Sequence, residues 1–287
     1  METSGLQAFA NPDTFDVSLL AIPGWTEPSV LNNLIKVCEG RSDCLGICDT
    51  PFGLKPQQVV DWSNGAGIYD GRHQAFNSSY VAFYWSWLLV RDSSLRKDIW
   101  LPPSGFVLSC IAYNDRVAEC WFAPAGLIRA RIPEALAVEY SPNRPERDLL
   151  YGDQNVINSI VKFKKDGICI YGQRTAQRRA TALDRVNVRR LSCYMRKIVA
   201  ASTQYFVFEQ NDAMTWDLWT MTVEPAIRKI KEKRGLYDYR VEMSDRTVTD
   251  YDIDTNTMPG RIQFKPTKVA EFIPLDFILL NTGAMFL

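Results

Sequence analysis

The sequence contains one histidine in 287 residues, His73, and this scarcity limits the catalysis open to it. His73 lies in a polar run typical of a surface loop, and no serine lies in a Gly-x-Ser-x-Gly motif, so a Ser-His-Asp or Cys-His site is not indicated. No P-loop is present, and the glycines near residues 65–71 do not follow a strand as a dinucleotide-binding loop requires. The sequence therefore predicts no catalytic and no cofactor-binding residues.

Long apolar runs are also missing. No stretch approaches the roughly 18 consecutive apolar residues of a membrane-spanning helix, so no membrane contact is expected. The first residues lack the basic and apolar regions of a secretory signal. The seven cysteines are an odd number and lie mostly in apolar runs, which predicts reduced core thiols in a cytosolic protein.

Metal-ligand patterns are incomplete. Cys38, Cys44 and Cys48 have no fourth ligand near them, so zinc is not predicted. The acidic run over residues 250–254 begins like a calcium-binding loop, but residues 255 and 261 are not the glycine and glutamate that such a loop needs. Its alternation of acidic and apolar residues predicts a half-exposed strand instead.

An excess of charge of either sign is absent, since 33 basic residues balance 33 acidic ones. This argues against binding nucleic acid through bulk electrostatics. The balance hides an asymmetry of 12 basic and 17 acidic residues over 1–150, against 21 and 16 over 151–287. Residues 162–197 alone hold 11 basic residues against Asp166 and Asp184. These fit a solvated helix face, a docking surface for an acidic protein or, third, a nucleic-acid surface.

The first half of the chain alternates apolar strand-like runs with helical patterns that begin at prolines. This order indicates a βαβ unit, and therefore a parallel sheet covered by helices. The Pro-rich segment 141–145 divides the chain into predicted domains 1–145 and 146–287. The predicted strands are residues 15–22 and 44–48, the predicted helices are 28–39, 56–62 and 106–113, and the aromatic run 79–90 fits either.

The second half segregates helices and strands, which predicts an α+β domain. An Asp-Gly pair at residues 166–167 predicts a hairpin between apolar runs. One helix should bury Val188, Leu191, Met195 and Ile198, and the next, capped by Asn211 or Asp212, should bury Trp216, Trp219, Val223, Ile227 and Ile230. The predicted strands are residues 237–243, 261–264 and 271–280.

Three groups of short motifs resemble the tail sheath proteins of contractile-tailed bacteriophages. Their order and spacing fit from about residue 15 to the end of the chain, and little of the family's N-terminal region precedes them, so a fragment is expected. The motifs are Asp16–Gly24 with Tyr80–Trp87, Leu101–Gly105 with Trp121–Gly126, and Gly172–Thr175 followed by Val186–Leu191, Phe208–Asp212, Thr215-Trp216 and Ala270–Ile273.

The resemblance implies a subtilisin-like α/β core domain without a catalytic triad and a smaller C-terminal α+β sandwich domain. It implies a structural subunit, not an enzyme and without cofactors, that forms six-fold rings by strand exchange and contracts to drive the tail tube through the host envelope. Implied partners are other subunits and the tube, baseplate and tail terminator proteins, in the virion and, during assembly, in the host cytoplasm. A phage-like bacteriocin or type VI secretion sheath, or a hydrolase of the same core fold, are the alternatives.

Two kinds of surface are candidates for contacts in such an assembly. Basic side chains on the two C-terminal helices could bind an acidic tube, and an apolar terminal strand would leave an open edge unless a partner covers it. The candidate residues are Arg189, Arg190, Arg196, Lys197, Lys229 and Lys233 for the basic faces, and Glu271, Phe272 and Ile273 for the strand.

Overall fold

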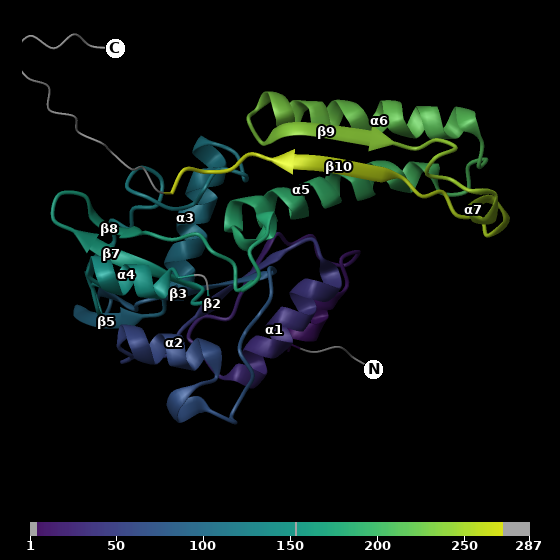
Figure 1. The fold of residues 1–287 in the computed structure, drawn as a ribbon. Helices are drawn as coiled ribbons and strands as arrows, with labels where there is room; N and C mark the ends of the chain where they lie inside the picture. Colours follow the sequence, from purple (N-terminus) through teal and green to yellow (C-terminus); the bar gives the residue numbers. More distant parts are fainter. Residues whose placement is uncertain (1–4, 153, 272–287) are drawn as a thin grey trace, which may run out of the picture.

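The computed structural model describes residues 5–152 and 154–271, which form a mixed α/β fold (Figure 1). Its centre is a five-stranded sheet with the strand order β1-β2-β3-β7-β8. The first four strands are parallel, and β8 is antiparallel to β7. The strands are β1 (Leu19–Ala21), β2 (Leu45–Asp49), β3 (Val81–Trp85), β7 (Ile157–Phe163) and β8 (Gly167–Ile170).

Helices cover both faces of this sheet, as the predicted βαβ order requires. Adjacent residues of one strand enter different clusters: Phe83 packs with α1, α2 and α4, whereas Tyr84 packs with α3. Successive side chains on a strand point to opposite faces, so strands covered on both sides are apolar throughout. The helices are α1 (Pro28–Arg41), α2 (Pro56–Asn64), α3 (Pro103–Val117) and α4 (Arg144–Leu150).

The aromatic run 79–90 forms strands, which settles the choice that its periodicity left open. It makes β3 and then β4, and β4 joins a separate antiparallel sheet of order β5-β4-β6. The small sheet comprises β4 (Leu88–Asp92), β5 (Lys97–Leu101) and β6 (Ala135–Val138).

Short 3-10 helices also occur along the chain. They are η1 (Gly5–Ala10), η2 (Gly67–Tyr69), η3 (Ala182–Asp184) and η4 (Gln204–Phe206). Among the described residues, no helix is long and apolar enough to cross a membrane.

The central sheet continues past residue 145, where the sequence predicts a domain boundary. β7 and β8 form the predicted hairpin, and β7 also pairs with β3, so the two strands complete the five-stranded sheet. This sheet and the helices on its two faces are called the first core. The change of core lies further along the chain, because Val186 still packs in that core whereas Leu191 packs in a third cluster. The sheet thus crosses the predicted boundary.

The C-terminal unit is built on two long helices and one hairpin. The α5 and α6 faces predicted from periodicity are buried, apart from the half-buried Ile198. Asp212 caps α6 by accepting a hydrogen bond from the Thr215 amide at 2.9 Å. The unit comprises α5 (Val186–Thr203), α6 (Ala213–Glu232), β9 (Leu236–Glu242), α7 (Asp250–Asp254) and β10 (Arg261–Pro266).

The strand predicted over residues 250–254 is wrong, since this segment forms helix α7. Thr249 accepts a hydrogen bond from the Asp252 amide, and the Asp252 carboxylate accepts one from the Thr249 amide. This capping box satisfies the first turn of a helix, and it overrides the alternating pattern. Of the strand predicted over 271–280, only Glu271 lies within the described residues.

A buried carboxylate joins the first core together. Asp49, at the carboxyl end of β2, accepts hydrogen bonds from the Gly24 amide at 2.9 Å and from the Ser104 amide and hydroxyl at 2.7 and 2.8 Å. Its exposed fraction is 1%. It therefore links the β1–α1 connection to the first turn of α3.

Replacing Asp49 with Asn should lower the free energy of unfolding by about 1–3 kcal/mol, because the Gly24 and Ser104 amides donate to different carboxylate oxygens and the asparagine side chain has only one oxygen. Burial raises the pKa of Asp49. Because its pKa is higher in the folded than in the unfolded state, the stability that Asp49 contributes is fully present below the unfolded-state pKa. That contribution is lost as the pH rises through the folded-state pKa. The substituted asparagine does not titrate, so the difference between wild type and Asp49→Asn should be largest at acid pH and shrink towards neutrality. Chemical denaturation at several pH values measures it, and a difference that grows with pH would contradict it.

Candidate functional site

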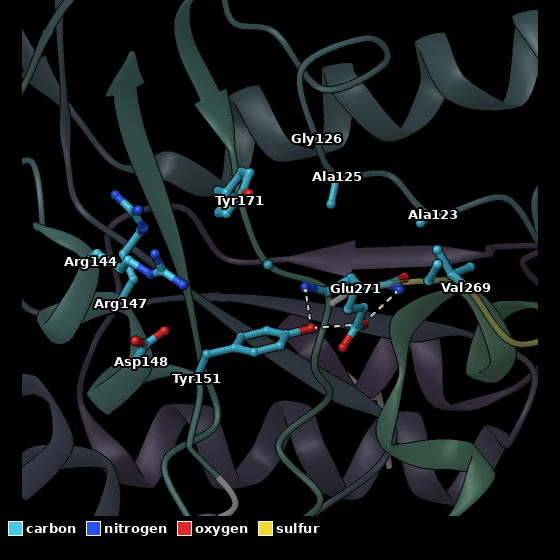
Figure 2. Close-up of a pocket in the computed structure, with 13 residues that line it drawn as sticks. Ala123, Ala125, Gly126, Arg144, Arg147, Asp148, Tyr151, Tyr171, Val269 and Glu271 are labelled. Carbon is cyan, nitrogen blue, oxygen red and sulfur yellow. Dashed lines mark hydrogen bonds between the residues drawn. The ribbon is translucent and has the colours of Figure 1, made fainter. Parts of the chain in front are cut away.

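A cavity of about 810 Å³ lies beside Glu271, and Figure 2 shows the residues that line it. Here the described chain returns from β10 to the first core (Figure 1). Three parts of the first core form its walls: α4, the segment directly after β8 and the loop that follows α3. The last described residues form the remaining wall. The lining residues are Ala123, Ala125, Gly126, Arg144, Arg147, Asp148, Tyr151, Tyr171, Gly172, Gln173, Val269, Ala270 and Glu271.

Glu271 is held in this cavity by four hydrogen bonds from three side chains. Figure 2 shows the bond from Tyr151 to Glu271. Arg185 binds both carboxylate oxygens, with Nε–Oε1 at 2.8 Å and Nη2–Oε2 at 2.9 Å. The Tyr151 hydroxyl donates at 2.9 Å and Gln173 Nε2 donates at 3.0 Å. A two-pronged arginine–carboxylate pair is among the stronger polar contacts in proteins.

The surroundings of Tyr151 favour its donation of a hydrogen bond to Glu271. Burial, followed by the negative charge of Glu271, raises the pKa of the Tyr151 phenol well above its usual range. The hydroxyl therefore stays protonated and can donate. The Arg185 guanidinium lies 5.7 Å from the centre of the Tyr151 ring, so it contacts both the ring and the carboxylate that the ring's hydroxyl binds.

Replacing Glu271 with Gln should release the chain from this anchor. The substituted glutamine keeps the shape but loses the charge that Arg185 pairs with, and a hydrogen bond to a charged group contributes about 1.5–3 kcal/mol. We expect faster amide hydrogen exchange and faster proteolysis at residues 267–271. Glu242→Gln is a suitable control, since it removes the carboxylate of a pair with Arg240 that lies in the C-terminal hairpin. Equal protection in wild type and Glu271→Gln would contradict the anchoring role.

The sequence predicts that Glu271 contacts another subunit or the tube, and this stays a prediction, since the bonds described above come from its own chain. Phe272 and Ile273 fall outside the described residues. The sequence does not predict the partners of Glu271, which are Arg185, Tyr151 and Gln173. They lie 86 to 120 positions before it, so no local pattern joins them to it, and the density of basic residues near 185 is the one related signal.

Arg189 and Arg190 do not lie on an open basic face, because both are buried in the described structure. The Arg189 guanidinium lies 4.0 Å from the centre of the Tyr80 ring and donates to the Ser79 hydroxyl. Arg190 pairs with Asp115 of α3 through both terminal nitrogens. These two side chains therefore fasten α5 to the first core, which corrects the expectation that they project outwards.

The other two basic candidates on α5 differ from each other. Lys197 pairs with Asp16 and donates to the Val17 carbonyl at 2.8 Å, so it holds the segment before β1. Arg196 is exposed, and no ion pair to it is found within residues 5–152 and 154–271. Only Arg196 on this helix keeps the surface position expected of a docking residue.

The basic end of α6 is largely neutralised within the chain. Lys233 pairs with Glu119, Arg228 with Glu224, and Lys231 with Asp238. Lys229 is exposed and forms no ion pair within the part of the chain that the structure describes. Lys229 is therefore the basic candidate on α6 that can meet an acidic partner without first breaking an internal pair.

His73 packs among aromatic rings. Its ring stacks on Phe76 with centroids 5.0 Å apart, and Nδ1 lies 2.9 Å from the Gln74 carbonyl. This arrangement does not resemble the Ser-His-Asp geometry. Among the described residues, no three His, Cys, Asp or Glu side chains are grouped to hold a metal ion.

Comparison with known proteins gives one consistent result. Residues 179–279 match the family described as the phage tail sheath C-terminal domain. The chain is 31% identical over 227 residues to the tail sheath protein of Vibrio phage KVP40, covering 79% of this chain and 33% of that protein. It is 27% identical over 292 residues to the tail sheath protein of Enterobacteria phage T4, covering 97% of this chain and 44% of that protein.

The fold agrees with this result. A contracted PVC sheath complex from an extracellular contractile injection system superposes with a TM-score of 0.78 at 22% identity, over 93% of this chain and 72% of that one. The chain spans less than half the length of the two curated relatives. By these matches, the chain belongs to the family of bacteriophage tail sheath proteins.

Proposed function

We propose that the chain is part of a structural subunit that polymerises around a tail tube and contracts to drive the tube through the host envelope. The match to named tail sheath proteins over most of the chain carries this proposal. These relatives are named for a structural part of a phage tail rather than for a reaction. The likeness to a sheath fold in its contracted state supports it.

The proposed core is subtilisin-like but lacks a catalytic triad. A mostly parallel sheet with helices on both faces supports this, as does a single histidine enclosed by aromatic rings. The smaller unit is the proposed C-terminal α+β sandwich domain. Because β7 and β8 complete the first sheet, we place the division between the two domains near residue 185 instead of residue 145.

The proposed partners are further sheath subunits, the tail tube, and the baseplate and tail terminator proteins, in a virion tail assembled in the host cytoplasm. Arg196 and Lys229 are the proposed tube contacts, since both are exposed and form no ion pair in the described part of the chain. An exposed cation of this kind can meet an acidic surface at little cost in existing contacts.

Negative-stain electron microscopy of the chain co-expressed with the tube protein of its own contractile system tests the proposal. A longer version with the remaining sequence of its relatives is examined in parallel. A regular coat on the tubes, formed by either version and weakened in Arg196→Glu/Lys229→Glu, is expected. Arg96→Glu/Arg116→Glu provides the same change of charge elsewhere on the surface. Bare tubes with both versions at every salt concentration would overturn the sheath function.

A further inference from the structure

The cavity beside Glu271 has an open positive mouth. Arg144 and Arg147 of α4 lie together there, with Asp148 beside them (Figure 2). Glu271 is already matched by Arg185, so the two arginines outnumber the one remaining acid. The Arg147 guanidinium lies 5.6 Å from the centre of the Tyr171 ring, so a positive charge and an aromatic ring are adjacent in the lining of the cavity. The mouth is therefore suited to an acidic group that comes with an apolar or aromatic neighbour.

Gln173 adds an unused acceptor to the wall of the same cavity. Its exposed fraction is 3%, and its Nε2 donates to Glu271. Its Oε1 accepts no hydrogen bond from residues 5–152 and 154–271. A buried acceptor without a donor is unfavourable by about 1–3 kcal/mol. A ligand that brings an N–H group into the cavity removes this cost, so the wall points to a peptide rather than to a simple anion.

The far tip of the C-terminal unit has the complementary composition. Helix α7 carries Asp250 and Asp254, which form no ion pair within the described residues. Between them Tyr251 is 75% exposed and Ile253 is 40% exposed. Figure 1 shows α7 at the opposite end of the molecule from α4, so this tip does not reach the cavity of its own chain.

We propose that α7 of one copy docks in the cavity beside Glu271 of a second copy, with Asp250 and Asp254 facing Arg144 and Arg147. The two surfaces are different, so the contact is heterologous, and an open complex has an unused tip at one end and an unused cavity at the other. Where the rotation between copies does not close a ring, repetition of such a contact builds a helical array. The inference rests on the proposed sheath function and names the residues that would carry one of its contacts between subunits.

Two variants of the chain test this contact by analytical ultracentrifugation. The cavity variant, Arg144→Glu/Arg147→Glu, keeps an intact tip, and the tip variant, Asp250→Lys/Asp254→Lys, keeps an intact cavity. Wild type should associate with increasing concentration, and each variant alone should associate at least tenfold more weakly. A 1:1 mixture should recover association, because the intact tip of one variant meets the intact cavity of the other, and the lysine tip meets the glutamate cavity with opposite charge. Arg96→Glu/Arg116→Glu should associate like wild type.

Three outcomes would overturn the docking proposal: monomeric wild type, variants that associate like wild type, or a mixture that recovers nothing. The altered side chains of α7, together with Arg144, lie at the surface, and thermal unfolding of each variant establishes that it is folded. The two proposals fail separately. If wild type coats tubes while the variants associate normally, the docking contact is wrong and the sheath function stands. If both the chain and its longer version leave tubes bare, the sheath function fails whatever the variants do.

Discussion

Replacing Arg41 with Ala should lower the free energy of unfolding by about 3–5 kcal/mol, the range for removing one partner of a buried ion pair. Arg41 ends α1, and its side chain is fully buried. It binds both oxygens of Asp43 at 2.9 Å and donates to the carbonyls of Phe9, Asn11 and Phe15. The guanidinium thus holds the segment before β1 against the first core, and its loss leaves a carboxylate and three carbonyls unmatched.

Urea denaturation followed by tryptophan fluorescence measures this change, and hydrogen exchange at residues 5–18 shows whether that segment is released. A fall in the melting temperature of about 10 °C is expected for a chain of this size. Lys36→Ala is the matched control, because it removes an exposed cation from the same helix and should alter stability by less than about 0.5 kcal/mol. A loss below about 1 kcal/mol in Arg41→Ala would show that Arg41 does not hold this segment.

Replacing Trp121 with Ala should separate the unfolding of the two units and lower stability by about 3–5 kcal/mol. Trp121 follows α3 in the chain, but its ring packs in the cluster formed by α5, α6 and the C-terminal hairpin. Its indole N–H donates to the Lys233 carbonyl at 3.0 Å, and its own carbonyl accepts from Asn187 at 3.2 Å. One side chain therefore joins the first core to the C-terminal unit.

Differential scanning calorimetry distinguishes one cooperative transition from two. We expect a single transition in wild type and two in Trp121→Ala, with the C-terminal unit melting first. Trp121→Phe keeps most of the packing but loses the hydrogen bond to Lys233, so it should lower stability by only about 1 kcal/mol and keep one transition. Trp25→Ala, at a tryptophan that is 58% exposed, is the control. An unchanged single transition in Trp121→Ala would exclude the coupling role.

Local features of the fold were predictable because their causes lie within a few residues. Val188, Leu191 and Met195 recur at helical spacing, and they are buried on one face of α5. Asp212 lies three residues before the amide that it caps. The same local logic explains the error at α7, since the capping box of Thr249 and Asp252 competes with an alternating pattern and the stronger local hydrogen bonds prevail.

The amino-acid sequence alone predicts the first βαβ unit, the hairpin of β7 and β8 and most of the buried faces of α5 and α6, because periodicity, turn residues and caps act over short stretches of chain. Which charges remain open depends on the folded structure. Arg189 and Arg190 meet partners 110 and 75 positions away, and Glu271 meets Arg185 at a separation of 86. Charge on a helix is visible in the sequence, but whether another layer covers it depends on how distant segments pack. For this reason the basic faces read from the sequence reduce to Arg196 and Lys229, while the cavity beside Glu271 emerges only in three dimensions.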